Sequence, residues 1–97
     1  MEIRFWSSRL QRCFQESSVT IRQWGPVVGQ RYVQRINAIK DLDRGEQLHL
    51  IRSLDFHPLT GERTGQHAIR LTGQMRLILT VDDERTVSIV EVVDYHD

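Results

Sequence analysis

The sequence predicts an α+β fold, with a short N-terminal strand and two or three helices in the first half and a small sheet in the second. Apolar residues recur every three or four positions from about residue 26 to residue 54, which is the period of an amphipathic helix. From about residue 67 onward apolar and polar residues alternate, which is the period of strands with one buried face. At 97 residues we expect one domain, residues 1–97.

The N-terminal segment predicts a strand followed by a short helix. Residues 2–6 alternate between charged and apolar side chains, which is typical of a strand. Ser7 or Ser8 can then cap a helix that runs to about Phe14. The polar stretch QESSVTIRQ is expected to be a connection.

The longest helix is predicted after Gly25, because Pro26 suits a first helical turn. Its apolar stripe consists of Val28, Tyr32, Ile36, Ile39 and Leu42. Arg31 and Arg35 lie off this stripe and are expected on a solvated face. One more short helix is expected before Asp55.

The stretch HAIRLTGQMRLILTV predicts a β-hairpin. Its bulky apolar residues all carry odd numbers and should form one buried face: Ile69, Leu71, Met75, Leu77, Leu79 and Val81. Two antiparallel strands place odd-numbered residues opposite odd-numbered residues only if the loop between them contains an odd number of residues. A loop of about three residues, 72–74, satisfies this condition. Arg70 then lies opposite Arg76 on the other face. Each arginine could meet a carboxylate, extend into water, or share a bound anion.

The last strand follows the same numbering and is apolar on both faces, so we expect it in the interior of the sheet. Val87, Ile89 and Val93 are odd and should face the core. Asp94 and His96 are even, which predicts that they share a face with Arg70 and Arg76, while Tyr95 points with the core residues.

Charge argues against a free-standing nucleic-acid binder, because 13 basic residues balance 13 acidic ones. All the basic residues except Lys40 are arginine, which suits bidentate contact with phosphate. The segment from His57 to Arg76 is locally basic, with three arginines and a single acidic residue, Glu62.

Several other classes of site are not indicated. Cys13 is the only cysteine, so no disulfide is expected and a buried, reduced side chain in the cytosol is favoured. No apolar run has membrane length and charges interrupt the first residues, so we expect a cytoplasmic protein without membrane contact. The four histidines show no zinc spacing, and no phosphate loop is present, so neither metal nor cofactor is expected.

Three segments together resemble the RelE/ParE toxin superfamily, and within it the HigB, or plasmid-killer, branch: FHPLTGERTGQHAIRL, GQMRL and VDYHD. The resemblance runs from His57 to His96 and implies a RelE-like fold with a mainly antiparallel sheet. It implies the toxin of a type II toxin–antitoxin system, which cleaves messenger RNA in the ribosomal decoding site and so inhibits translation. The implied partners are a helix-turn-helix, HigA-like antitoxin and, through that complex, operator DNA.

The same resemblance implies a set of site residues. The family's functional positions correspond to His57, Arg76, Asp94, Tyr95 and His96, with Arg70 and Arg63 as further phosphate contacts. Two positions depart from the family pattern: Thr60 stands where a lysine is usual, and Met75 where a tryptophan is usual.

These residue types suit RNA cleavage without a metal. The 2′-hydroxyl must lose a proton, the leaving 5′-oxygen must gain one, and the phosphorane needs positive charge. His96 is the first candidate for a proton transfer and His57 the second, although a loop histidine bonded before Pro58 is an equally good reading of His57. Arg76 would contact the phosphate, and Tyr95 could stack on an unpaired base.

Two alternatives of other classes remain. ParE-like relatives inhibit DNA gyrase without cleaving RNA, and a catalytically weak binding module could act with its antitoxin in operator repression. The C-terminal Tyr-His pair favours the nuclease. Zero net charge predicts poor binding of free RNA, so the ribosome would have to present the message.

Overall fold

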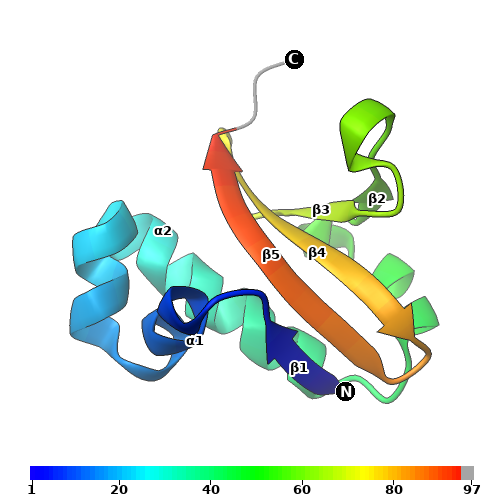
Figure 1. The fold of residues 1–97 in the computed structure, drawn as a ribbon, viewed down its shortest axis with the longest axis horizontal. Helices are drawn as coiled ribbons and strands as arrows, with labels where there is room; N and C mark the ends of the chain where they lie inside the picture. The colour runs from blue at the N-terminus through cyan, green and yellow to red at the C-terminus, as the bar shows by residue number, and fades with distance from the viewer. Residues whose placement is uncertain (95–97) are drawn as a thin grey trace.

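Five strands form one sheet in the order β1-β5-β4-β3-β2, in a computed structural model that describes residues 1–94 (Figure 1). The strands are β1 (Glu2–Phe5), β2 (His57–Pro58), β3 (His67–Arg70), β4 (Met75–Asp83) and β5 (Thr86–Asp94). Only β1 and β5 pair in parallel, and every other neighbouring pair is antiparallel. The predicted α+β fold with a mainly antiparallel sheet is therefore confirmed, and β5 is an interior strand.

Two α-helices, α1 (Ser8–Gln15) and α2 (Ser17–Lys40), follow β1. The side chain of Ser7 caps α1 by accepting a hydrogen bond from the Leu10 amide at 3.2 Å, as the sequence predicted. The expected connection at QESSVTIRQ is wrong, because α2 begins at Ser17 and bends at Gly25, whose φ is 82°. No described helix is both long and apolar enough to cross a membrane.

The first half of α2 escaped prediction because its one buried residue, Thr20, is polar. Thr20 is only 2 % exposed and packs against Gly29 in the second half of the helix. A Cβ at Gly29 would lie 3.1 Å from the Thr20 hydroxyl, so the bend at Gly25 brings the two halves into close contact. A glycine facing a threonine leaves no hydrophobic pattern in the sequence.

Short 3₁₀ helices connect α2 to the sheet. The first two, η1 (Gly45–Leu50) and η2 (Arg52–Leu54), take the place of the short helix expected before Asp55. A third, η3 (Gly61–Arg63), lies between β2 and β3. Leu48 and Leu54 turn inward from η1 and η2 and are fully buried, so this segment also covers the core.

The main core lies between the helices and one face of the sheet. Tyr32, Ile36 and Ile39 of α2 are fully buried against the sheet, in the stripe that the sequence predicted. The odd-numbered hairpin residues that face them are buried as expected: Ile69, Leu71, Leu77 and Leu79, with Met75 and Val81 partly buried. Cys13 is buried in the same cluster. Strand alternation therefore identified this face correctly.

The opposite face of the sheet carries a separate, small apolar cluster, which we call the open face. Ala68, Ile78 and Val90 form its centre, and Leu59 and Val93 pack against them. Within the part of the chain described, neither α-helix contributes to this cluster. The open face is therefore the side of the sheet on which polar side chains can gather near solvent.

The register places Arg70 opposite Arg76, as predicted from a three-residue loop. Between β4 and β5, however, the register shifts, since Ile78 pairs with Glu91 while Leu79 pairs with Ile89. Val90 is thus an extra residue, a β-bulge, and the alternation changes face beyond it.

This bulge corrects two predictions. Val93 lies opposite Arg76, on the open face, whereas the sequence reasoning placed it with the core. Asp94 lies opposite Met75, whose side chain packs against the helix-covered core, so Asp94 does not share a face with Arg70 and Arg76. The predicted faces of Tyr95 and His96 concern positions outside the described residues.

Candidate functional site

The open face aligns residues from four strands in two rows. In one row His57, Ala68, Ile78 and Glu91 lie side by side across β2, β3, β4 and β5. In the next row Arg70, Arg76 and Val93 are paired. Paired residues in a ladder project to the same side of a sheet. One histidine and two arginines, widely separated in the sequence, are therefore brought to one surface.

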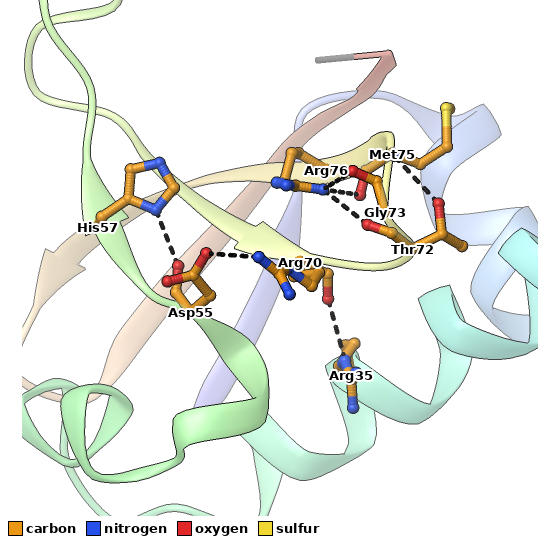
Figure 2. A network of polar contacts seen from close by, with 8 residues as sticks. All are labelled: Arg35, Asp55, His57, Arg70, Thr72, Gly73, Met75 and Arg76. Carbon is orange, nitrogen blue, oxygen red and sulfur yellow. Dashed lines mark hydrogen bonds and ion pairs between the residues drawn. The ribbon is translucent and has the colours of Figure 1, made fainter. Parts of the chain in front are cut away.

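Arg76 holds the hairpin loop. Its residue is only 8 % exposed, and Nη1 donates to the carbonyl oxygens of Thr72 at 2.7 Å, Met75 at 3.1 Å and Gly73 at 3.3 Å (Figure 2). Carbonyl oxygens have two lone pairs, so the Met75 carbonyl accepts from Arg76 as well as from the Leu71 and Thr72 amides. The contacts fix one positive charge at the end of the hairpin.

Arg70 is held much more loosely. Its side chain is 51 % exposed, and Nη2 lies 3.4 Å from Oδ2 of Asp55, which is equally exposed. Exposed ion pairs of this kind contribute little and exchange readily. The backbone of Arg70 is fixed instead, because its carbonyl accepts a hydrogen bond from Nε of Arg35 at 3.1 Å.

The arginines on α2 are not simply solvated. Arg35 binds the carbonyl of Arg70, and Arg31 donates through Nη1 to the carbonyl of Leu71 at 3.4 Å. Burial first, and then the charge of Arg31, lower the pKa of Arg35. These two contacts connect α2 to the hairpin, so they support the strand that carries Arg70.

His57 is oriented by the residue that also holds Arg70. Its Nδ1 lies 2.8 Å from the carbonyl oxygen of Asp55, as Figure 2 shows. A carbonyl only accepts, so Nδ1 carries the proton of the neutral ring, and Nε2 is then the nitrogen that accepts a proton. The predicted local hydrogen bond of His57 is found, although His57 lies in β2 and not in a loop. The same bond sets the tautomer that a general base requires.

Asp55 was not singled out from the sequence. It is the only non-glycine residue with positive φ in the described part of the chain, at φ 49°, where it ends η2. This backbone turn lets its carbonyl reach His57 while its carboxylate reaches Arg70 (Figure 2). Aspartate tolerates left-handed backbone better than most residues, and that tolerance was the available signal.

Arg63 reaches the open face from η3. Its Nη2 forms an ion pair and hydrogen bond with Oε1 of Glu91, and its Nη1 donates to Oε1 of Gln66 at 2.9 Å. Glu91 therefore neutralises Arg63 in the described structure. This contact is closer than the contact between Arg70 and Asp55, so Glu91 holds Arg63 more firmly than Asp55 holds Arg70.

His49, Phe56 and His67 form a cluster of contacting rings, in which Phe56 packs against the main core. His67 stacks on Phe56 at a ring separation of 4.5 Å, and His49 packs edge-on against the same ring at 4.8 Å. Nδ1 of His67 is buried without a hydrogen-bond partner among the described residues. Burial first, then the charges of His49 and His57, lower the pKa of His67. No group of three or more metal-ligating side chains occurs within residues 1–94.

The site predicted from the sequence is thus brought together in part. His57, Arg70 and Arg76 share the open face, and Arg63 joins them through Glu91. Asp94 is exposed and lies on the other side of β5. Tyr95 and His96 are outside the part of the chain that the structure describes.

The five-stranded sheet and its helices match the fold of the RelE/YoeB-like toxins. YoeB in the YoeB–YefM complex from Staphylococcus aureus is 20 % identical with a TM-score of 0.62, the match covering 100 % of this chain and 98 % of that one. The YoeB/ParE toxin from Agrobacterium tumefaciens is 11 % identical with a TM-score of 0.65, covering 99 % and 100 %.

A third structure with the same fold is YafQ from E. coli strain BL21(DE3), 14 % identical with a TM-score of 0.60, the match covering 96 % of this chain and 91 % of that one. No protein-family profile matches the chain, and no curated protein matches it in sequence. The similarity is therefore one of fold, carried over nearly the whole length of the chain.

Proposed function

We propose that this protein is the toxin of a type II toxin–antitoxin system and that it cleaves messenger RNA on the ribosome. The observation that carries the proposal is the open face of a RelE/YoeB-like fold, on which His57, Arg70 and Arg76 gather. The sequence segments HPLTGER and VDYHD favour the HigB branch of these toxins. As in the sequence reasoning, the proposed site of action is the cytoplasm.

The proposed reaction needs no metal. A base removes the proton of the 2′-hydroxyl, and the 2′-oxygen attacks the adjacent phosphorus while the bond to the 5′-oxygen breaks. An acid protonates that leaving oxygen, so the products are a 2′,3′-cyclic phosphate and a 5′-hydroxyl. His57, whose Nδ1 is fixed by Asp55, is suited to accept a proton at Nε2, and His96 is proposed for the other transfer.

The phosphorane would be stabilised by two arginines with different roles. Arg76 supplies a positive charge that is already fixed before substrate arrives, which is the arrangement that stabilises developing charge most effectively. Arg70 is exposed and loosely paired, so it can leave Asp55 for a phosphate oxygen. Tyr95 is proposed to stack on a base of the message. Asp94 is also proposed to take part, although it lies on the other side of β5 from the two arginines.

The missing family lysine at Thr60 needs a substitute cation, and Arg70 fits better than Arg63. Arg63 would have to give up Glu91, a partly buried partner that it contacts closely. Arg70 would give up only a 3.4 Å contact between two half-exposed groups. We therefore propose that Arg70 supplies the positive charge that a lysine at position 60 would otherwise provide.

The partners follow from the same proposal. Zero net charge favours a message presented by the ribosome over free RNA. The similar YoeB from Staphylococcus aureus was solved in complex with YefM, which supports an antitoxin partner for this chain. We propose a helix-turn-helix, HigA-like antitoxin whose complex with this protein binds operator DNA.

Growth arrest and RNA-end mapping test the function together. Expression of the protein in a bacterial host should stop growth and create new RNA 5′ ends within coding regions. Substitution His96→Ala, in protein shown to be folded by its thermal unfolding, should abolish both effects. An unimpaired His96→Ala variant would remove this residue as acid or base.

Gyrase inhibition is the second candidate, favoured by the similarity to a structure named YoeB/ParE toxin and by Thr60 in place of a lysine. In that case expression would induce the DNA-damage response without new ends in coding RNA. The same cultures measure both readouts, so the two functions are separated directly.

A further inference from the structure

A cationic pocket lies between α1 and the first half of α2, and none of the residues assigned to cleavage lines it. Its volume is about 310 Å³, and it is lined by Ser8, Arg9, Arg12, Val19, Arg22 and Gln23. Three of these six residues are arginines, and none is acidic. In a chain whose net charge is zero, this is a local concentration of positive charge.

The arginines of this pocket have only weak partners within residues 1–94. Arg12 lies 3.6 Å from Glu16, and both side chains are more than half exposed, at 62 % and 56 %. Arg22 uses Nε for a 3.4 Å bond to the Ser18 carbonyl, which leaves its charge uncompensated. Exposed contacts of this kind contribute at most about 1 kcal/mol, so these arginines can exchange them for contacts with a bound anion.

An aromatic surface adjoins the pocket. A second cavity of about 290 Å³ shares Arg9 and Gln23 with it. Its other lining residues are Ser7, Leu10 and Trp24 on the helix side and Val90, Glu91 and Val92 of β5. Trp6, immediately before Ser7, is 60 % exposed. Arg9 and Trp24 thus line the same cavity, and a guanidinium group beside an aromatic ring is a combination with which proteins hold single-stranded nucleic acid, through phosphate contacts and base stacking.

We propose that Arg9, Arg12 and Arg22 bind the phosphodiester backbone of RNA, as a positioning contact made by residues other than those assigned to cleavage. The choice of RNA as the anion rests on the proposed function. An acidic protein segment is the less suitable ligand, because Val19 is the only aliphatic side chain in the lining and a docked peptide needs an apolar floor. Arginine forks match phosphate oxygens in pairs.

Side-chain NMR of the full chain tests the site directly. The protein would carry His96→Ala so that the probe stays intact, and the Nε–Hε signals of its arginines would be followed at low salt. Addition of a single-stranded RNA of 12 nucleotides should shift the signals of Arg9, Arg12 and Arg22. A glutamate peptide of equal charge should leave them in place. Equal or larger shifts with the peptide, or no shift with either probe, would overturn the proposal.

Salt dependence provides a second test. Replacing Arg9, Arg12 and Arg22 together by glutamine should lower the slope of log affinity for the RNA against log salt by about 2, from roughly 0.7 per phosphate contact on a single strand. The matched control replaces Arg4, Arg52 and Arg85, three exposed arginines outside the pocket, and should change the slope by less than half as much. Equal slopes for the two triple variants would contradict a specific site.

These binding measurements are independent of cleavage. A protein that binds RNA in this pocket but cuts no message on ribosomes would refute the proposed function and leave the pocket assignment standing. A protein that cuts messages normally while the pocket signals stay unshifted would refute the pocket assignment alone.

Discussion

Arg70 and Arg76 occupy paired positions on β3 and β4, yet the structure predicts very different contributions to stability. Arg76 is 8 % exposed and donates three hydrogen bonds to the carbonyls of the hairpin loop. The Arg70 side chain is 51 % exposed and forms one contact at 3.4 Å. Replacing each by alanine compares the two roles within one ladder position.

The magnitudes follow from burial and charge. A hydrogen bond to a charged group contributes about 1.5–3 kcal/mol, and the three bonds of Arg76 share one nitrogen, so they do not add fully. Arg76→Ala also leaves three loop carbonyls without this donor. We expect it to lower the free energy of unfolding by about 3 kcal/mol, against about 0–1 kcal/mol for Arg70→Ala.

Urea unfolding at pH 7, followed by the fluorescence of the chain's two tryptophans, measures both values. Arg76→Lys keeps the charge but loses the planar fork, so it should fall between wild type and Arg76→Ala. Equal destabilisation by Arg76→Ala and Arg70→Ala, or a change of less than about 1 kcal/mol in the free energy of unfolding for Arg76→Ala, would contradict a structural role for the Arg76 hydrogen bonds. Loss of toxicity in Arg76→Ala alone therefore says little about chemistry, and Arg70→Gln is the cleaner test.

Two further predictions concern the backbone and pH. Gly25 has φ 82° and ψ 170°, so Gly25→Ala should destabilise the protein by about 1–3 kcal/mol. In the control variant Gly73→Ala no atom lies within 4 Å of the added carbon, so stability should change by less than about 0.5 kcal/mol. Urea unfolding measures both changes. Because the pKa of His67 is lowered from its usual 6.5, the unfolded chain takes up a proton before the folded chain does, and stability should fall as pH drops below about 6.5. His67→Phe keeps the stacking on Phe56 and should reduce this loss between pH 8 and pH 5; an unchanged pH dependence would exclude His67 as its source.

Strand alternation predicted the core face because the bulky apolar residues of the hairpin all carry odd numbers. It failed in β5, where VSIVEVV is apolar in both phases and conceals the bulge at Val90. One signal was present: Glu91 is odd, so unbroken alternation would have buried a carboxylate in the core. Reading that conflict as a bulge would have moved Asp94 to its observed face.

For the candidate site, the sequence predicted the types of residue and one strand pairing, but not the contacts of the side chains. The pairing of Arg70 with Arg76 followed from an odd loop length. The side-chain partners could not be predicted in this way. Asp55 reaches Arg70 and His57 through a left-handed turn, and Glu91 reaches Arg63 from a strand 28 residues away in sequence. Such contacts depend on the path of loops, which hydrophobic patterning does not specify.

The central claim is that the protein cuts messenger RNA by attack of the 2′-hydroxyl when the ribosome presents it. The most direct measurement incubates purified protein with one message, either free or bound to purified ribosomes, and ligates an adaptor to the new 5′ ends with and without prior kinase treatment. We predict cuts within the coding region on ribosomes, weak or absent cleavage of free RNA, and ends that ligate only after kinase treatment because they carry 5′-hydroxyls. Efficient cleavage of free RNA, ends that ligate without the kinase, or no new ends on ribosomes would contradict the account.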